Sequence, residues 1–380
     1  MRTDLINSET PAYAGSRGEH QCTRRRNANN QRSTAMAKMK AAFLRKPGDI
    51  RIQEMNVPIP RDDEALIRIK AVGVCGSDVH FYEVGRIGDF VVTEPLILGH
   101  ECAGEVVEVG KDVKTLKVGD RVAVEAGVPC RKCDFCRLGR YNLCADVTFL
   151  ATPPFHGAYR EYIAHPEDFL FKLPDNMSFE EGAMIEPLAV GVYAAERGDV
   201  NIRNTVAIIG AGPIGLMTLQ AARARGATDV VITDLEPFRL DFAKKLGASL
   251  AINAKEEDPV QRILEYTDGG ADVVMEAVGF PETIGQTIKI ARPGAVIVWI
   301  GMPTVDEIPI RVVEAICKDA DIRGIFRYAN AYPPAIKLVS SGKVDVKSMI
   351  TTTFILDQVQ EALEYPGKHP GTCIKVMVEV

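Results

Sequence analysis

Residues 205–215, Thr-Val-Ala-Ile-Ile-Gly-Ala-Gly-Pro-Ile-Gly, join a short apolar run to a glycine-rich turn. The apolar run predicts a buried strand. A helix is expected from Pro213 to Arg225, because proline is favoured in the first turn of a helix. The next apolar run, Asp229 to Asp234, predicts a second strand. A strand, a helix and a strand in this order are typical of a parallel sheet with crossover helices.

The same alternation continues further along the chain. A helical stretch from Leu240 to Gly247 is followed by strand-like runs at Ala271–Glu276 and Ala295–Ile300. We therefore assign residues 189–319 to an α/β domain with a doubly wound parallel sheet.

The flanking segments have a different pattern. Short alternating runs, such as Ala65–Val72 and Gly104–Val109, are separated by glycine and proline and predict an all-β, barrel-like domain over residues 39–188. Strand-like runs return at Ile322–Phe326 and Thr372–Val380, so residues 320–380 are assigned to the same domain. The expected fold class is α/β plus β, with the α/β unit inserted in the β domain.

The composition excludes several classes of function. A net charge of −6 is not that of a protein with the basic surface that nucleic-acid binding requires, so we expect no nucleic-acid partner. No apolar run reaches the roughly 18 residues of a membrane-spanning helix, so we expect no membrane partner. Nine cysteines without a secretory signal fit a reducing compartment, and a cytoplasmic location is expected.

Residues 1–38 differ from the rest of the chain. They contain Arg24-Arg25-Arg26, several asparagines and few apolar residues, and we expect a disordered leader. An arginine-rich leader also leaves mitochondrial import open as an alternative, although Asp4, Glu9 and Glu19 argue against a transit peptide.

The glycine-rich turn predicts a dinucleotide site because it follows a strand and opens a helix. Gly210 permits the tight turn, Gly212 lets the backbone approach a pyrophosphate, and Gly215 allows close packing of helix and strand. Asp234 ends the next strand, where its carboxylate can bind ribose hydroxyls and repel a 2′-phosphate. NAD is therefore favoured over NADP, although Arg239 could pair with a 2′-phosphate.

Four cysteines with close spacing predict a closed metal site. Cys130, Cys133, Cys136 and Cys144 form a C-x2-C-x2-C-x7-C cluster. Zn²⁺ accepts four thiolates in a tetrahedral arrangement, which leaves no open position for chemistry. The alternative is a pair of disulfides, which would close small strained loops. We expect a structural zinc here and a reaction elsewhere in the chain.

Cys75, His100 and Glu101 are candidates for a second, open zinc site, since one thiolate, one imidazole and one carboxylate leave a fourth position free. From the residues alone, a buried cysteine and a histidine with ordinary hydrogen bonds are the commoner interpretation of such scattered residues. Glu186 lies in an apolar stretch at the expected domain boundary, where its carboxylate needs a partner. Ser77 and His80 can relay a proton from this region to water.

The order of five motifs resembles the zinc-dependent medium-chain alcohol dehydrogenases: Cys75-Gly-Ser-Asp, Gly99-His-Glu101, the four-cysteine loop, Glu186-Pro187 and Gly210-Ala-Gly-Pro-Ile-Gly215. The resemblance covers the chain from about residue 39 onward. Three longer stretches resemble the polyol branch of that superfamily, the sorbitol and xylitol dehydrogenases: Gly85–Val92, Ala151–Pro154 and Gly324–Pro333. The resemblance implies a GroES-like β-barrel catalytic domain, a Rossmann cofactor domain and a homotetramer.

The resemblance also implies roles for single residues. It implies a catalytic zinc on Cys75, His100 and Glu101, with Glu186 near the metal directly or through water, and substrate contacts from Arg327 and Tyr328. The residues implied to contact NAD are Ile214, Asp234, Arg239, Ile300, Gly301, Met302 and Phe326.

The expected reaction is the reversible oxidation of a polyol to a ketose. The substrate hydroxyl replaces water on zinc and loses its proton, and the resulting alkoxide then expels hydride from its carbon to nicotinamide C4. The sequence does not rank the polyols, because Phe81 stands where animal sorbitol dehydrogenases have a tyrosine, as in some xylitol and arabinitol dehydrogenases. Two alternatives are an amino-alcohol dehydrogenase such as threonine dehydrogenase, and a zinc-stabilised NAD-binding protein without catalysis.

Overall fold

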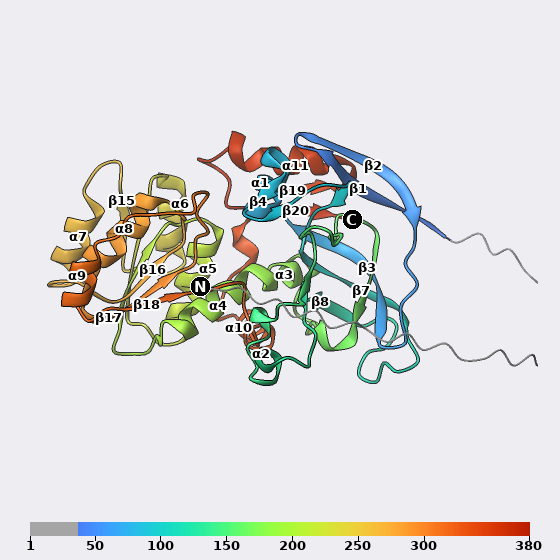
Figure 1. The fold of residues 1–380 in the computed structure, drawn as a ribbon, viewed down its shortest axis with the longest axis horizontal. Coiled ribbons are helices and arrows are strands. Elements are labelled where there is room, and N and C mark those ends of the chain that lie inside the picture. Colours follow the sequence, from blue (N-terminus) through green and yellow to red (C-terminus); the bar gives the residue numbers. More distant parts are fainter. Residues whose placement is uncertain (1–36) are drawn as a thin grey trace, which may run out of the picture. The chain divides into compact units, whose positions relative to one another are not determined.

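The computed structural model describes residues 37–380 (Figure 1). The expectation of a disordered or targeting leader falls almost entirely on residues 1–36, which lie outside the described residues. Within the described part, no helix combines the length and the apolar composition needed to cross a membrane.

A seven-stranded sheet combines strands from both ends of the described chain. Its order is β12-β8-β7-β3-β20-β19, and β11 pairs with β3 outside this path. The strands are β3 (Glu64–Gly73), β7 (Glu101–Val109), β8 (Arg121–Val124), β11 (Tyr162–Pro166), β12 (Leu170–Lys172), β19 (Ile350–Ile355) and β20 (Lys375–Glu379). Because β20 pairs antiparallel with β3, the last strand completes a sheet that the first part of the chain begins.

Smaller elements surround this sheet. The strands are β1 (Lys38–Lys46), β2 (Asp49–Asn56), β4 (Arg86–Ile87), β5 (Phe90–Val91), β6 (Leu96–Ile97), β9 (Gly127–Val128) and β10 (Thr148–Phe149). The helices are α1 (Gly76–Val84), α2 (Asp134–Arg137), α3 (Phe179–Ala183) and α11 (Val359–Lys368). A buried cluster that includes Leu44, Ile67, Val106 and Val378 packs between these elements and the sheet.

A six-stranded parallel sheet forms the second architectural unit, with the order β15-β14-β13-β16-β17-β18. The strands are β13 (Thr205–Ile209), β14 (Asp229–Asp234), β15 (Leu250–Asn253), β16 (Ala271–Glu276), β17 (Ala291–Trp299) and β18 (Asp321–Gly324). Helices pack around it (Figure 1): α5 (Pro213–Ala224), α6 (Pro237–Lys245), α7 (Pro259–Tyr266), α8 (Pro281–Ile290) and α9 (Val312–Cys317). The doubly wound parallel sheet expected from the sequence is confirmed.

The expected domain boundaries differ from the structure at two places. β18 was expected in the β domain, but it pairs in parallel with β17, because the chain re-enters the parallel sheet after α9. The boundary expected after residue 188 falls inside α4 (Ile185–Arg197), which packs on both α5 and α10 (Tyr332–Ser340). The residues of this helix belong to one hydrophobic core that continues across the expected boundary, so the packing does not break at residue 188.

Candidate active site

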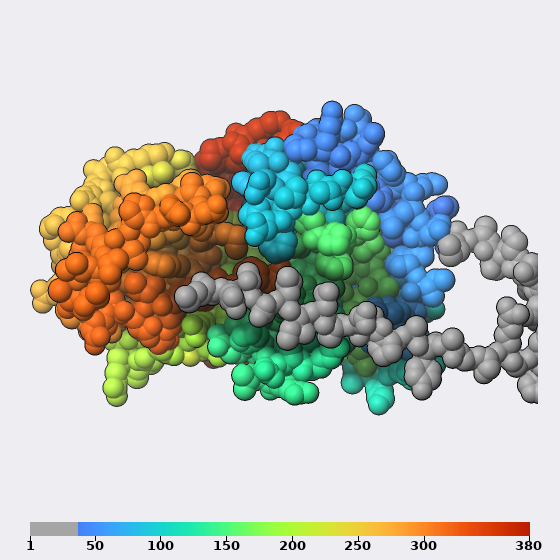
Figure 2. All heavy atoms as spheres, viewed as in Figure 1, coloured from blue at the N-terminus to red at the C-terminus, as the bar shows by residue number. Residues whose placement is uncertain are grey.

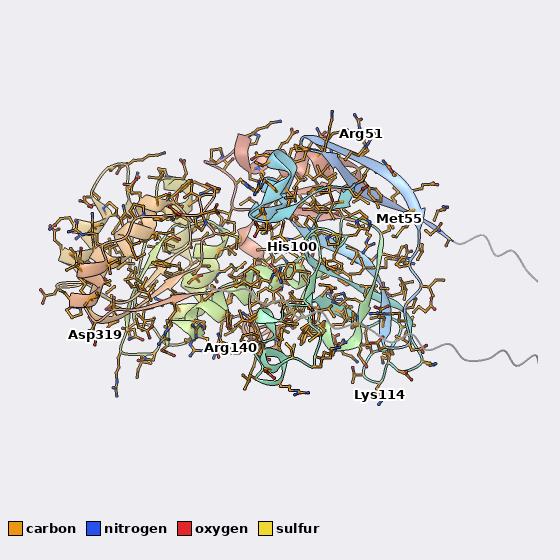
Figure 3. The ribbon with its side chains drawn as sticks, in the orientation of Figure 1. Arg51, Met55, His100, Lys114, Arg140 and Asp319 are labelled. Atoms are coloured by element: carbon orange, nitrogen blue, oxygen red, sulfur yellow. The ribbon has the colours of Figure 1, made fainter. Side chains whose placement is uncertain are left out.

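Cys75, His100 and Glu101 come together at the end of the seven-stranded sheet. Cys75 caps the start of α1, and His100 and Glu101 stand where β7 begins. One donor atom from each of the three residues lies within 4.8 Å of the others. Gly99 makes this turn possible: its φ is +87°, and a Cβ there would lie 2.9 Å from Val72. His100 is labelled in Figure 3.

Asp78 orients His100, although we did not predict a role for it. Its Oδ1 accepts a hydrogen bond from the Gly99 N–H at 2.9 Å and lies 3.5 Å from His100 Nδ1. Burial opposes a charged imidazole, but the Asp78 carboxylate and the Cys75 thiol raise the pKa of His100 well above 6.5. A carboxylate on one imidazole nitrogen leaves the other nitrogen to face a metal, which is how metal-binding histidines are held.

Glu101 faces a buried cation that sequence analysis missed. Lys375 Nζ, on β20, donates to Glu101 Oε1 at 2.6 Å and to the Val74 carbonyl at 2.8 Å. The second oxygen, Oε2, lies 2.5 Å from Nζ but makes no hydrogen bond of adequate geometry within the described residues. Gly73 leaves room for it, since a Cβ there would lie 2.1 Å from Oε2. A buried carboxylate oxygen with spare acceptor capacity beside a thiol and an imidazole fits a bound zinc.

Glu186 and Tyr328 form a buried polar pair beside these three residues. The Tyr328 hydroxyl donates to Glu186 Oε1 at 2.8 Å. Burial raises the pKa of Glu186 to about 7, against the opposing effect of His100. Within the described residues, Glu186 is not one of the donors that lie within 4.8 Å of each other. Because its pKa is raised to about 7, the carboxyl group of Glu186 can hold or release a proton near neutral pH.

Arg327 lines a small cavity together with Tyr328 and has little hydrogen bonding of its own. Its guanidinium carbon lies 4.2 Å from the ring centre of Phe149 and 4.5 Å from that of Phe326. Its Nη1 is buried and has no hydrogen-bond partner within the described residues. Burial lowers the pKa of Arg327 below its ordinary value, and Tyr328 and Glu186 partly oppose this shift. The Phe149 ring also lies 5.6 Å from the His100 ring, so it joins Arg327 to the cysteine-histidine-glutamate group.

The two residues of the predicted proton relay lie in one helix. Ser77 and His80 both lie in α1, three residues apart and thus on one face, and both are partly exposed. In the described part of the chain, neither side chain makes a hydrogen bond with protein atoms, so the relay stays a prediction.

The four predicted cysteines gather at one point. Their sulfur atoms lie within 4.8 Å of one another, with 3.4 Å between Cys133 and Cys136 and 3.9 Å between Cys130 and Cys136. These distances are too long for disulfides, whose sulfur atoms lie about 2.05 Å apart. The backbone N–H groups of Lys132 and Cys133 lower the pKa of Cys130 to about 6, which favours a thiolate. Four sulfurs in this arrangement fit the predicted zinc.

The glycine-rich turn has the geometry that its sequence predicted. Gly210 has a φ of +98°, and a Cβ on Gly215 would lie 1.8 Å from the Gly210 carbonyl oxygen. Gly212 is the N-cap of α5, and a Cβ there would meet no atom within 4 Å. Open space therefore faces the first turn of this helix, which includes Ile214. That arrangement fits a pyrophosphate.

Asp234 is held at the end of β14. Oδ2 accepts from the Ala211 N–H at 2.8 Å, and Oδ1 accepts from the Leu235 and Glu236 N–H groups at 2.8 and 2.9 Å. A carboxylate offers about four lone-pair positions, so roughly one is left for a ribose hydroxyl. Arg239 Nη1 lies 3.9 Å from Oδ2, close enough to weaken the repulsion of a 2′-phosphate.

The remaining predicted cofactor residues follow the carboxyl ends of neighbouring parallel strands. Ile300, Gly301 and Met302 follow β17, and Phe326 follows β18. A Cβ on Gly301 would lie 2.3 Å from the Gly279 nitrogen, so the turn after β17 packs on the turn after β16. Parallel sheets bind ligands at this edge.

Two comparisons with known proteins cover nearly all of this region. Residues 61–175 match the alcohol dehydrogenase GroES-like domain, and residues 213–341 match the zinc-binding dehydrogenase family. The chain is 48% identical to a sorbitol dehydrogenase of Bacillus subtilis, over 91% of this chain and 98% of that protein. It is 43% identical to a sorbitol dehydrogenase of Mus musculus, over 88% of this chain and 93% of that protein.

A solved structure extends the comparison to the fold. An Escherichia coli oxidoreductase of unknown specificity superposes with a TM-score of 0.87 at 42% identity, covering 90% of this chain and 99% of that one. The likeness therefore includes both sheets and the segments that join them.

Proposed function

We propose that this chain, which belongs to the polyol branch of the zinc-dependent medium-chain alcohol dehydrogenases, oxidises a polyol such as sorbitol or xylitol to the ketose with NAD. When bound, zinc lowers the pKa of the substrate hydroxyl and NAD accepts the hydride. Cys75, His100 and Glu101 would hold the catalytic zinc, and Cys130, Cys133, Cys136 and Cys144 the structural one.

Arg327 carries the substrate assignment. A guanidinium that is largely buried and has an unpaired Nη1 leaves a donor without its hydrogen bond, which is costly unless a ligand supplies an acceptor. Glu186 and Tyr328 lie nearby and are also polar. A substrate with several hydroxyl groups can satisfy these groups together, whereas a simple alcohol cannot.

Proton movement is assigned to the residues around the substrate. Glu186, with a pKa raised to about 7 by burial, can exchange a proton with the substrate region at neutral pH. Ser77 and His80 would carry that proton to water through the partly exposed face of α1. Because Glu186 lies outside the group of donor atoms within 4.8 Å of one another, it would contact the metal through water rather than directly.

NAD would bind along the carboxyl edge of the parallel sheet. Gly210, Gly212 and Gly215 would receive the pyrophosphate together with the N-terminus of α5, and Asp234 the adenosine ribose. Ile214, Ile300–Met302 and Phe326 would line the rest of the site, with Arg239 at its ribose end.

We also propose a homotetramer in the cytoplasm. α9 exposes Val312, Val313 and Ile316, at 55%, 75% and 72%, beside β18, which ends the parallel sheet. Figure 2 shows the orange atoms of this part of the chain at the surface, on the left of the view. A second copy of this chain could cover it.

A substrate panel tests the proposed function. The purified protein is mixed with NAD⁺ and sorbitol, xylitol, threonine or 2-propanol, and NADH is followed by absorbance. Turnover of a polyol well above that of 2-propanol is expected. Preference for threonine would indicate an amino-alcohol dehydrogenase, and no turnover with any alcohol would indicate a binding protein.

A further inference from the structure

The segment from Phe326 to Asn330 has an unusual backbone. Arg327 and Asn330 have φ values of 56° and 57°, in the left-handed region that non-glycine residues seldom occupy. Such conformations cost free energy and persist only where the surrounding structure determines them. Because this segment carries Arg327 and Tyr328, whatever holds it also sets where these two side chains point.

The four-cysteine loop supplies hydrogen bonds to both ends of this segment. Asn142 Nδ2 donates to the Phe326 carbonyl at 2.9 Å. The Asn330 N–H donates to the Tyr141 hydroxyl at 2.7 Å, and Asn330 Nδ2 donates to the Gly139 carbonyl at 2.8 Å. Three bonds thus join two regions that lie more than 180 residues apart in the chain.

Glu125 fixes the central member of this set. The Tyr141 hydroxyl donates to Glu125 Oε1 at 2.8 Å, and Glu125 is 1% exposed. A hydroxyl that donates to Glu125 and accepts from Asn330 has a fixed orientation. Glu125 directly follows β8, so the Glu125–Tyr141 pair links the strained segment to a strand of the sheet.

The cysteines determine where these partners lie. Cys136 and Cys144 flank Gly139, Tyr141 and Asn142 in the chain. The loop has little hydrophobic core of its own, since α2 buries none of its residues and Leu138 is 73% exposed. Zinc bound to the four cysteine sulfurs would stabilise the loop in place of a hydrophobic core.

A small cavity lies between the loop and the segment. Its walls include Glu125, Asn142, Phe149, Arg327 and Tyr328. Asn142 Oδ1 and Arg327 Nη1 are both buried and without hydrogen-bond partners within the described residues. The loop thus adds an acceptor residue to the cavity that also holds the donor residue assigned to the substrate.

We propose that Glu125, Tyr141 and Asn142 are positioning residues, through which the four-cysteine loop holds Arg327 and Tyr328 in place for the polyol. The substrate part of this inference rests on the proposed function. Its consequence is that the closed metal site contributes to polyol binding as well as to stability. A purely structural loop would instead stabilise the fold and leave substrate preference unchanged.

Hydrogen exchange of the full, zinc-loaded protein gives a direct test that does not depend on turnover. In Tyr141→Phe, exchange of peptides covering residues 326–332 should be at least about tenfold faster, because the Asn330 N–H loses its acceptor. Asn142→Asp keeps the size of the side chain but removes the N–H donor to the Phe326 carbonyl, so it should also speed exchange of the same peptides. Tyr82→Phe is the matched control, because the Tyr82 hydroxyl donates to Glu364 of α11 at 2.5 Å and not to the loop or the segment. This variant should leave exchange of these peptides unchanged.

Conservative replacement separates positioning from general damage. Glu125→Gln retains an acceptor for Tyr141 and should behave like the wild type, whereas Glu125→Leu should accelerate exchange as Tyr141→Phe does. With saturating NAD⁺, Tyr141→Phe should lower kcat/KM for the preferred polyol about tenfold, mainly through KM, and change that for 2-propanol less than about twofold.

Two results would overturn the proposal. One is unchanged exchange of residues 326–332 in both Tyr141→Phe and Asn142→Asp. The other is an equal fall of kcat/KM for the polyol and for 2-propanol. If the wild type oxidises no polyol, the proposed function fails, and the exchange experiment alone still decides whether the loop positions the segment.

Discussion

Replacement of Lys375 by methionine should expose the electrostatic balance at Glu101. Lys375 and Glu101 are 3% and 1% exposed, and Nζ lies 2.6 Å from Oε1. Burial alone would lower the pKa of Lys375, but Glu101 raises it above 10.5. Methionine fills a similar volume without charge, so the variant leaves a buried carboxylate without its cation.

The size of the effect follows from the loss of one partner of a buried ion pair, which costs about 3–5 kcal/mol. For the roughly 340 residues of Ala37–Val380, an unfolding entropy of about 2.1 cal/mol/K per residue gives about 0.7 kcal/mol/K. If these residues unfold in one transition, the Tm of the metal-free protein should fall by about 4–7 °C. With zinc bound, the metal charge compensates the negative charge of Glu101, so the variant should lose about 2–3 kcal/mol less free energy of unfolding than without zinc.

The assay is thermal unfolding of wild type and Lys375→Met, each with and without zinc. The change in Tm on zinc removal is compared between the two proteins. This comparison removes the effect of the structural zinc, because both proteins lose that zinc on chelation. Lys40→Met is the control, because Lys40 pairs with Asp357 on the surface, where both side chains are about half exposed and the pair should contribute less than about 1 kcal/mol. An equal fall in Tm with and without zinc would show that Glu101 does not face the metal.

Four further predictions address the other parts of the site. Cys133→Ser should remove about one zinc per chain and lower Tm while NAD⁺ still binds; metal analysis showing an unchanged zinc content would contradict the four-thiolate site. Asp234→Ser keeps an acceptor for the backbone but removes the charge, so the ratio of kcat/KM for NADP⁺ to that for NAD⁺ should rise roughly a hundredfold; equal use of both cofactors by the wild type would refute the reasoning. Arg327→Ala should lower kcat/KM for the polyol roughly tenfold to a hundredfold and that for 2-propanol little; an equal loss for both would assign Arg327 to the fold or the cofactor. Burial lowers the pKa of His165 to about 4, so the unfolded state takes up a proton at a higher pH than the folded state does. The free energy of unfolding should therefore fall by up to about 3 kcal/mol as the pH drops from about 6.5 to 4. Urea unfolding of His165→Gln should show a smaller fall over this pH range than the wild type.

The parallel sheet was the most predictable part of the fold. The apolar runs at 205–209, 229–234 and 271–276 match β13, β14 and β16 residue for residue. Strands that are buried on both faces consist of continuous apolar runs, so their ends are visible in the sequence. β17 begins at Ala291, earlier than expected, because Arg292, Pro293 and Gly294 are exposed and interrupt the apolar pattern.

Long-range partners were the least predictable. The cysteine cluster is local, and its spacing alone placed four sulfurs together. Lys375 is 274 residues from Glu101, and no local pattern distinguishes it from a surface lysine. Phe149 and Glu125 gave no chemical signal either, whereas Asp78 lies three residues after Cys75, a helical spacing that could have linked the two. β18 was recognised as a strand but placed in the wrong sheet, because an apolar run does not specify its neighbours.

The place of β20 inside the seven-stranded sheet affects the order in which the chain can fold during synthesis. Met377 pairs with Gly73, so the two partners emerge from the ribosome about 300 residues apart, a delay of roughly 15–60 s at common translation speeds. The parallel sheet, complete by residue 324, can form during this interval. Until β20 arrives, residues 71–73 of β3 lack this partner, although β11 can already pair with residues 64–68, and Glu101 has no lysine beside it. The amino-terminal unit should therefore finish folding last and depend most on protection by chaperones in the meantime.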